Sequence, residues 1–165
     1  MNRYNPNFRS ANATVLILPK DDYSFSIGEV KPFKNDKTIE GGDTVEQHGV
    51  RTSLTVKGGE FDGKSIPLSF YLNKEEGWGM SKQFIMAALG YPINKAGENK
   101  YNEDCDASPE AFDFSYDPDT NEIGAGWKKV QGAMVNAGVA SKPNKNNAAQ
   151  INQTFRWEPF GTPLV

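Results

Sequence analysis

Two alternating segments joined by a glycine-rich loop constrain the fold of this chain more than any other feature. Side chains alternate in polarity from Val50 to Val56 and from Ile66 to Leu72, and this period predicts two β-strands. The loop between them, Gly58–Ser65, fits the phosphate-binding pattern G-x-x-x-x-G-K-S/T. That pattern binds nucleotide where the loop opens a helix, whose free amides hold the phosphates. Because a strand follows this loop, we expect an antiparallel hairpin and no nucleotide site.

The chain length and composition suit a single intracellular domain. With 165 residues, 37% of them hydrophobic, the chain can build one modest core. No run approaches the length of a membrane span, and the N-terminus lacks the apolar stretch of a signal peptide. We therefore expect a soluble cytoplasmic protein without a membrane partner. The single Cys105 and the single His48 exclude an intrachain disulfide and a cysteine or histidine metal cluster, so we expect no metal and no cofactor.

The charges are distributed unevenly along the chain. Eight acidic residues and no Lys or Arg lie between Glu103 and Glu122. Without them, 18 bases stand against 13 acids, so the rest of the chain has a net charge of +5. A basic body with an acidic insert is compatible with nucleic-acid contact on one face. We interpret the insert as a solvated loop; the alternative is a nucleic-acid mimic that competes for the protein's own groove or for a partner's.

The predicted elements place one domain at residues 13–160. In chain order we expect a loosely held arm (1–12), a short edge strand or the entry to the barrel (13–19), a strand (23–30), a charged loop (31–43) and the hairpin (45–74). A helix capped by Ser81 and ended by Gly90 (80–90) and the acidic insert (about 94–126) follow. The chain then continues with strands at 127–139 and 150–158, separated by a mobile basic loop (140–147), and a short tail (161–165). This order is typical of an all-β protein with one helix, the OB fold. That fold is a five-stranded Greek-key barrel, and here its helix would lie between the third and fourth strands. Periodicity alone leaves a β-sandwich open.

Three parts of this pattern support a family resemblance. They are the loop Gly59–Lys64 between the second and third strands, the helix ending Ala87–Gly90, and the strand starting Trp127–Val130 paired with 150–157. In these parts the chain resembles a family of phage-encoded OB-fold single-stranded DNA-binding proteins, over roughly residues 20 to 160. The resemblance implies single-stranded DNA as the ligand, and phage replication or recombination proteins as partners; a homo-oligomer is compatible with it. The chain departs from the family in its long acidic insert, and residues 159–165 lack the acidic tail with which many single-strand binders recruit partners.

The hairpin supplies the first candidate binding residues. Single-strand binding requires cations along the backbone and exposed aromatic faces on which bases stack. If Val50, Leu54 and Phe70 face the core, then Arg51, Lys57 and Tyr71 share the outer face. The alternative is that Tyr71 packs on a neighbour and that the two cations are simply solvated.

Further candidates lie outside the hairpin. They are Lys31, Phe33 and Lys34 in the charged loop, Trp78 at the bend before the helix, Trp127, Lys128 and Lys129 at the start of the fourth strand, and Arg156 in the last strand. We expect Phe155 and Trp157 in the core, which turns Arg156 outward. Trp78 is either a lid over the barrel end or a stacking group, and Phe33 has a similar ambiguity.

The sequence gives little support to an enzyme. Asp117–Asn121 imitates the start of a calcium loop, but Glu122 stands where glycine is needed and Lys128 where the closing Glu should be, so we interpret it as a turn. No Ser or Cys has the context of a nucleophile. The remaining alternative to DNA binding is an interaction or structural protein, either a barrel or sandwich in an assembly or an inhibitor that presents the acidic loop.

Overall fold

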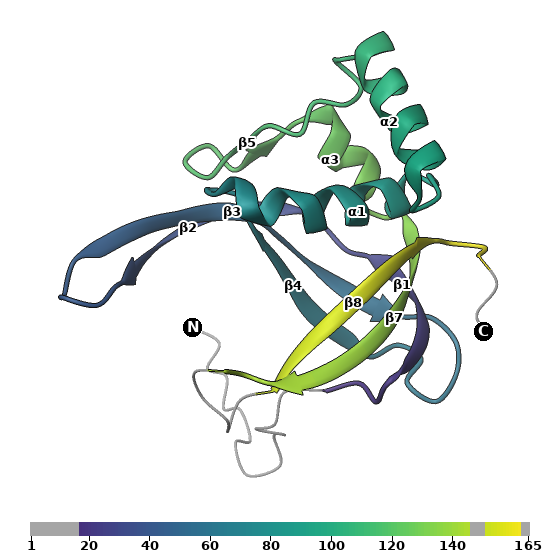
Figure 1. Cartoon of the computed structure of the whole chain (residues 1–165), viewed down its shortest axis with the longest axis horizontal. Coiled ribbons are helices and arrows are strands. Elements are labelled where there is room, and N and C mark those ends of the chain that lie inside the picture. Colours follow the sequence, from purple (N-terminus) through teal and green to yellow (C-terminus); the bar gives the residue numbers. More distant parts are fainter. Residues whose placement is uncertain (1–16, 146–150, 163–165) are drawn as a thin grey trace, which may run out of the picture.

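A six-stranded antiparallel sheet forms the body of the protein, and helices cover one end of it (Figure 1). The structure is a computed structural model that describes residues 17–145 and 151–162. Its elements are β1 (Asp21–Ile27), β2 (Lys31–Thr38), β3 (Thr44–Val56), β4 (Ser65–Tyr71), the 3₁₀ helix η1 (Glu75–Gly77), α1 (Trp78–Ala88), α2 (Lys95–Ala107), β5 (Tyr116–Asp117), β6 (Glu122–Ile123), α3 (Ala125–Val130), β7 (Met134–Pro143) and β8 (Ile151–Pro159). A mainly β protein is thus confirmed.

The strand order is that of a Greek key. β4 pairs with one edge of β3, whereas β2 and then β1 pair with the other edge, so β1 and β2 act as one bent strand. β7 pairs with the free edge of β1, and β8 pairs with β7. The fourth long strand therefore lies beside the first, which defines the Greek key. In the described residues, the outermost strands β4 and β8 share no backbone pairing.

Helix α1 lies where these two outermost strands approach each other. Phe84 of α1 is buried, with its ring centroid 4.9 Å from that of Phe70 on β4 and 4.8 Å from that of Trp157 on β8. Burying an aromatic side chain of this kind contributes about 1.5–3 kcal/mol. The core therefore continues from β4 to β8 through the helix, in place of strand pairing.

The predicted hairpin is confirmed. Val50 pairs with Phe70 and Leu54 with Ile66, and all four side chains are buried. The connecting loop turns through glycines with positive φ, among them Gly58 at 86°, where its N–H donates to the Asp62 carboxylate at 2.6 Å. A strand, not a helix, follows the loop, so the phosphate-binding pattern is a hairpin turn here.

The predicted helix is also confirmed, as α1, but its predicted cap is wrong. Gly77 occupies the N-cap position, and the Ser81 hydroxyl donates back to the Gly77 carbonyl at 3.1 Å from within the first turns. Gly90, with φ of 90°, follows the end of the helix as expected.

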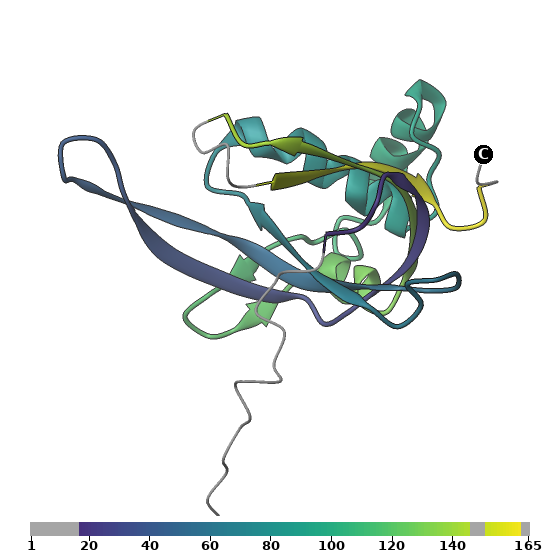
Figure 2. The same cartoon turned by 90° about the horizontal axis from the view of Figure 1, so that it is seen from below.

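The charged loop predicted at 31–43 is wrong, because Lys31–Thr38 form β2. β2 and β3 extend beyond the sheet as a two-stranded ribbon (Figures 1 and 2). Most side chains of the ribbon are exposed on both faces, so its sequence shows no apolar alternation. The edge strand predicted at 13–19 lies mostly outside the described residues, as does most of the tail, and the arm lies wholly outside them; residues 17–19 are not in a strand. The mobile loop predicted at 140–147 is wrong over residues 140–143, which extend β7 and pair with β8, and part of its remainder lies outside the described residues.

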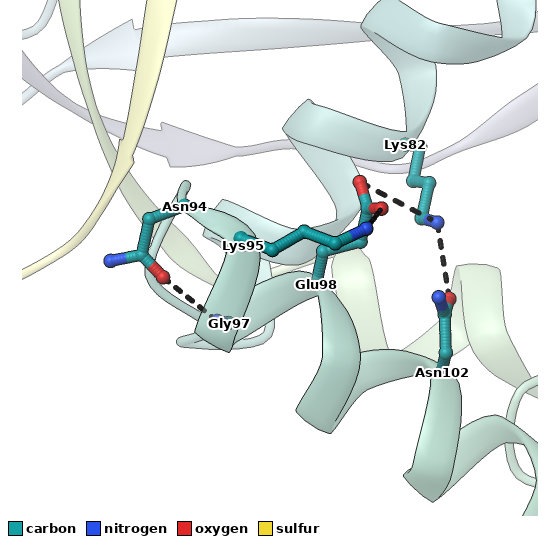
Figure 3. Close-up of polar contacts among 6 residues, drawn as sticks. All are labelled: Lys82, Asn94, Lys95, Gly97, Glu98 and Asn102. Atoms are coloured by element: carbon teal, nitrogen blue, oxygen red, sulfur yellow. Dashed lines mark hydrogen bonds and ion pairs between the residues drawn. The ribbon is translucent and has the colours of Figure 1, made fainter.

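The acidic insert is not a loop, which corrects a second prediction. It contains α2 and the short hairpin β5–β6, and α3 begins at its end. The Asn94 side chain caps α2 by accepting from the Gly97 N–H at 2.8 Å. Lys82 of α1 reaches across to α2, 3.1 Å from the side-chain oxygen Oδ1 of Asn102 and 3.9 Å from the Glu98 carboxylate (Figure 3). The fourth long strand consequently starts at Met134 instead of residue 127.

Among the described residues, no helix is both long and apolar enough to cross a bilayer.

Candidate nucleic-acid interface

One face of the three strands β2, β3 and β4 brings several predicted residues together. We call it the outer face, and it comprises the side chains of alternate residues 31–37 on β2, 45–55 on β3 and 65–71 on β4. The register aligns Phe33, Gly49 and Tyr71 in one row across the strands. The next row aligns Lys31, Arg51 and Ser69. Phe33 and Lys31, which are distant from Tyr71 in the sequence, therefore become its neighbours.

An aromatic pair spans the first row across its central glycine. Neighbouring strands are about 4.8 Å apart, so Phe33 and Tyr71 start about 10 Å from each other. Their ring centroids nevertheless lie 5.3 Å apart in an edge-to-face arrangement, with the rings reaching toward each other beside Gly49. A Cβ at Gly49 would lie 1.8 Å from the Phe70 carbonyl oxygen, so only glycine fits. Tyr71 remains 46% exposed, which confirms its predicted outward orientation.

Cations surround this aromatic pair. The Arg51 guanidinium carbon lies 5.9 Å from the centroid of the Phe33 ring, within cation–π range. Lys31 is exposed beside it and contacts Glu29, just before β2, at 3.7 Å. Strand alternation turns Asp36 and Glu46 to the opposite face, so the outer face, all of which is described, has no carboxylate of its own. The face therefore offers aromatic edges and positive charge together.

Lys34 lies on the opposite face from its neighbour Phe33. Its ammonium group binds the Asp119 carboxylate of the β5–β6 hairpin at 2.5 Å, and this hydrogen bond raises the pKa of Lys34. Its partner across the strands, His48, contacts the Tyr116 hydroxyl through Nδ1 at 2.6 Å. Lys34 therefore belongs to the contact between the ribbon and the acidic insert, not to the outer face.

By strand alternation Lys57 points to the same face as Arg51, but it lies far from Arg51 along the strand. Six residues of strand separate them, about 20 Å at 3.3 Å per residue. Lys57 is exposed just past β3, where its N–H donates to the Ser24 carbonyl at 2.9 Å. The predicted grouping of Arg51 with Tyr71 is thus present, while Lys57 lies at the other end of the strand.

Trp78 lies just beyond the end of β4. Its indole is 51% exposed, and Nε1 donates to the Leu72 carbonyl at 2.9 Å. This bond fixes the indole next to the residue that follows Tyr71. The Trp78 ring is therefore exposed at the end of β4, where α1 begins.

The candidates on α3 and β8 lie elsewhere. Trp127 is 1% exposed and donates from Nε1 to the Phe114 carbonyl at 2.8 Å, so it offers no ring face to a base. Lys128 and Lys129 are exposed on α3, and the Lys129 ammonium lies 5.3 Å from the Phe112 ring centroid. Trp157 is buried as predicted, and Arg156 points outward.

Arg156 is, however, surrounded by acids. Its guanidinium lies 3.7 Å from both the Asp22 and the Glu158 carboxylates. It is exposed on β8, whereas the outer face lies at the β2–β4 end of the sheet.

Sequence reasoning missed Gly49 and Lys37 as members of the outer face. A glycine inside a strand signals a close backbone approach, and Gly49 stands within the predicted hairpin. Its role depends on Phe33, whose strand was not predicted. Lys37 was missed for the same reason: the face to which its side chain points can be assigned only when residues 31–38 are known to form a strand.

Within the described part of the chain, no three His, Cys, Asp or Glu side chains are grouped to hold a metal ion. Searches against protein-family models and curated proteins give no match to this chain.

Proposed function

We propose that this protein binds single-stranded DNA along the outer face of β2, β3 and β4. The observation that carries the proposal is the Phe33–Tyr71 pair flanked by Arg51 and Lys31 on a face without carboxylates. Base stacking on an exposed aromatic side chain contributes about 1–3 kcal/mol per base. The cations neutralise phosphates. Neither contact distinguishes one base from another, so binding is tolerant of sequence.

The strand order supports the same proposal. With β1 and β2 counted as one strand, the sheet has the five strands and the Greek-key order of the OB fold, and α1 fills the space between β4 and β8. We propose that it is an OB-fold barrel. In that fold the second and third strands provide the oligonucleotide-binding face, and these correspond to β3 and β4. Following the family resemblance, the proposed setting is phage DNA replication or recombination in the host cytoplasm.

A fluorescence-anisotropy titration of labelled oligo-dT at several salt concentrations tests the proposal. We expect binding at low salt and a linear fall of log K with log salt, with a slope of about −0.7 per neutralised phosphate. A duplex of the same length is the control, because paired bases cannot stack on Phe33 and Tyr71. No binding at low salt, or affinity independent of salt, would contradict DNA binding and favour the interaction protein.

A further inference from the structure

A largely apolar cavity of about 600 Å³ lies between α1 and the acidic insert. Its wall includes Trp78 and Ile85 of α1, Tyr101 of α2, and Phe114 and Tyr116 of the acidic insert. Together with Trp127, side chains distant in the sequence thus bring five aromatic rings around one space. Its size is that of small-molecule sites, which are mostly apolar with a few polar groups.

The cavity lies past the end of β4, on the opposite side of the sheet from the outer face. Strand alternation turns Leu72, which lines the cavity, to the opposite face from Tyr71. The Trp78 indole, which forms one side of the cavity, is held by its 2.9 Å hydrogen bond to the Leu72 carbonyl and is 51% exposed. On the other side, Tyr116 is fixed to β3 through the His48 ring, which also lies on that opposite face. A strand of DNA that leaves Tyr71 would therefore pass the end of β4 and the Trp78 indole before it reaches this opening.

The charges at the cavity favour a neutral planar group over a phosphate. Lys82 is the one charged residue of the lining, and its ammonium lies 5.6 Å from the Tyr101 ring centroid. Glu98 partly neutralises it at 3.9 Å, and the Asn102 side chain accepts its hydrogen bond at 3.1 Å (Figure 3). A cation already satisfied in this way attracts phosphate weakly. The aromatic walls remain available for stacking.

We propose that this cavity takes one nucleobase of the bound single strand, turned away from its neighbours and placed against Trp78. The inference rests on the proposed DNA binding, which supplies the strand. Turning out a base of single-stranded DNA costs less than flipping one from a duplex. The acidic insert thereby contributes aromatic rings to binding, while its carboxylates stay at the surface.

The intrinsic fluorescence of Trp78 tests this in the unaltered protein. The chain has three tryptophans, and Trp127 and Trp157 are 1% and 2% exposed, so acrylamide quenching reports mainly on Trp78. Saturating oligo-dT should lower the fluorescence of Trp78 and protect it from acrylamide. If anisotropy shows oligo-dT bound while both signals stay unchanged, the cavity is empty in the complex and this inference is wrong, although the outer face still binds.

A cavity-filling variant gives a second test. Gly79 lines the cavity, and a Cβ there would meet no atom within 4 Å, so Gly79→Phe fills the space without a backbone clash. We expect about a tenfold loss of oligo-dT affinity, in line with the stacking of one base. Gln83→Phe adds the same ring at an exposed α1 position outside the lining and should bind as the unaltered protein does. Equal affinities of the two variants would overturn the assignment, whereas no binding by the unaltered protein would overturn the DNA interface itself.

Discussion

Two rows of residues lie at opposite ends of the sheet, and each has a glycine between two larger side chains. The side chains are aromatic in one row and charged in the other. In one row Phe33, Gly49 and Tyr71 are aligned, and in the other Asp22, Gly138 and Arg156. In both, the central strand carries a glycine: the space of a Cβ is taken by the β4 backbone at Gly49 and by the ends of the Asp22 and Arg156 side chains at Gly138. The first pair is two rings 5.3 Å apart, and the second is an ion pair at 3.7 Å.

The difference shows why exposure and charge sign do not identify a binding residue. Arg51 and Arg156 both point outward on the same sheet. Arg156 already has two carboxylates within 4 Å, whereas Arg51 has no ion pair with any described residue and lies beside an aromatic ring. A phosphate would have to compete with Asp22 and Glu158 for Arg156, but not for Arg51. The carboxylates on the same face therefore leave Arg51, and not Arg156, available to a phosphate.

Removing both rings of the first row should have the largest effect. We expect the double variant Phe33→Ala/Tyr71→Ala to lose about 1–3 kcal/mol of oligo-dT binding per stacked base, measured by anisotropy. Because no charge is removed, the salt dependence should stay as in the unaltered protein. Both side chains are partly exposed, so the melting temperature should change little. A collapse of the melting temperature with unchanged affinity per folded molecule would show that the rings are structural.

Replacing the central glycine of each row by alanine compares how tightly the two rows are packed. Gly49→Ala should destabilise the protein by about 1–3 kcal/mol and weaken oligo-dT binding, because its Cβ would lie 1.8 Å from a backbone carbonyl and force β4 away. Gly138→Ala meets only the ends of the Asp22 and Arg156 side chains, at 3.0 Å and 3.3 Å, and these can move. Urea unfolding measures both. Equal losses of unfolding free energy in the two variants would contradict the close approach of β3 and β4.

The two arginines should differ in the salt dependence of binding. Arg51→Ala should make the slope of log K against log salt shallower by about 0.7, the loss of one phosphate contact. Arg156→Ala should leave the slope unchanged, because its charge is already paired. A shallower slope in Arg156→Ala alone would move the interface to the β8 end of the sheet.

The smallest effect is expected for Lys34. It neighbours Phe33 in sequence but binds Asp119 on the opposite face, so Lys34→Ala should leave oligo-dT affinity and its salt slope unchanged. The same anisotropy series measures this. A loss like that of Arg51→Ala would mean that DNA reaches both faces of the ribbon.

The hairpin half of the outer face was predictable from sequence, whereas its β2 half was not. Buried Val50, Leu54 and Phe70 impose an alternation that fixes the orientations of Arg51 and Tyr71. β2 lies mostly in a ribbon whose two faces are both exposed to solvent, so its sequence shows no such alternation. The residues that neighbour Phe33 across the strands could therefore not be predicted.

The acidic insert was misinterpreted for a related reason. Only Gly97 and Tyr101 of α2 are buried, too few to show a helical apolar stripe. Tyr101 packs edge-to-face on Tyr91 and Phe112, and no pattern in this charged, turn-rich segment indicates these contacts. The cavity walls, which depend on this packing, were therefore beyond sequence reasoning.

Backbone amide chemical shifts measured on addition of oligo-dT test the central claim most directly, because they report on both ends of the sheet in one experiment. We predict large changes in the amide chemical shifts of Phe33, Gly49, Arg51 and Tyr71. The amide chemical shifts of residues 138–140 of β7 and 154–156 of β8 should not change. Shifts concentrated at β7 and β8, with β2–β4 unchanged, would contradict the assignment of the outer face as the DNA interface.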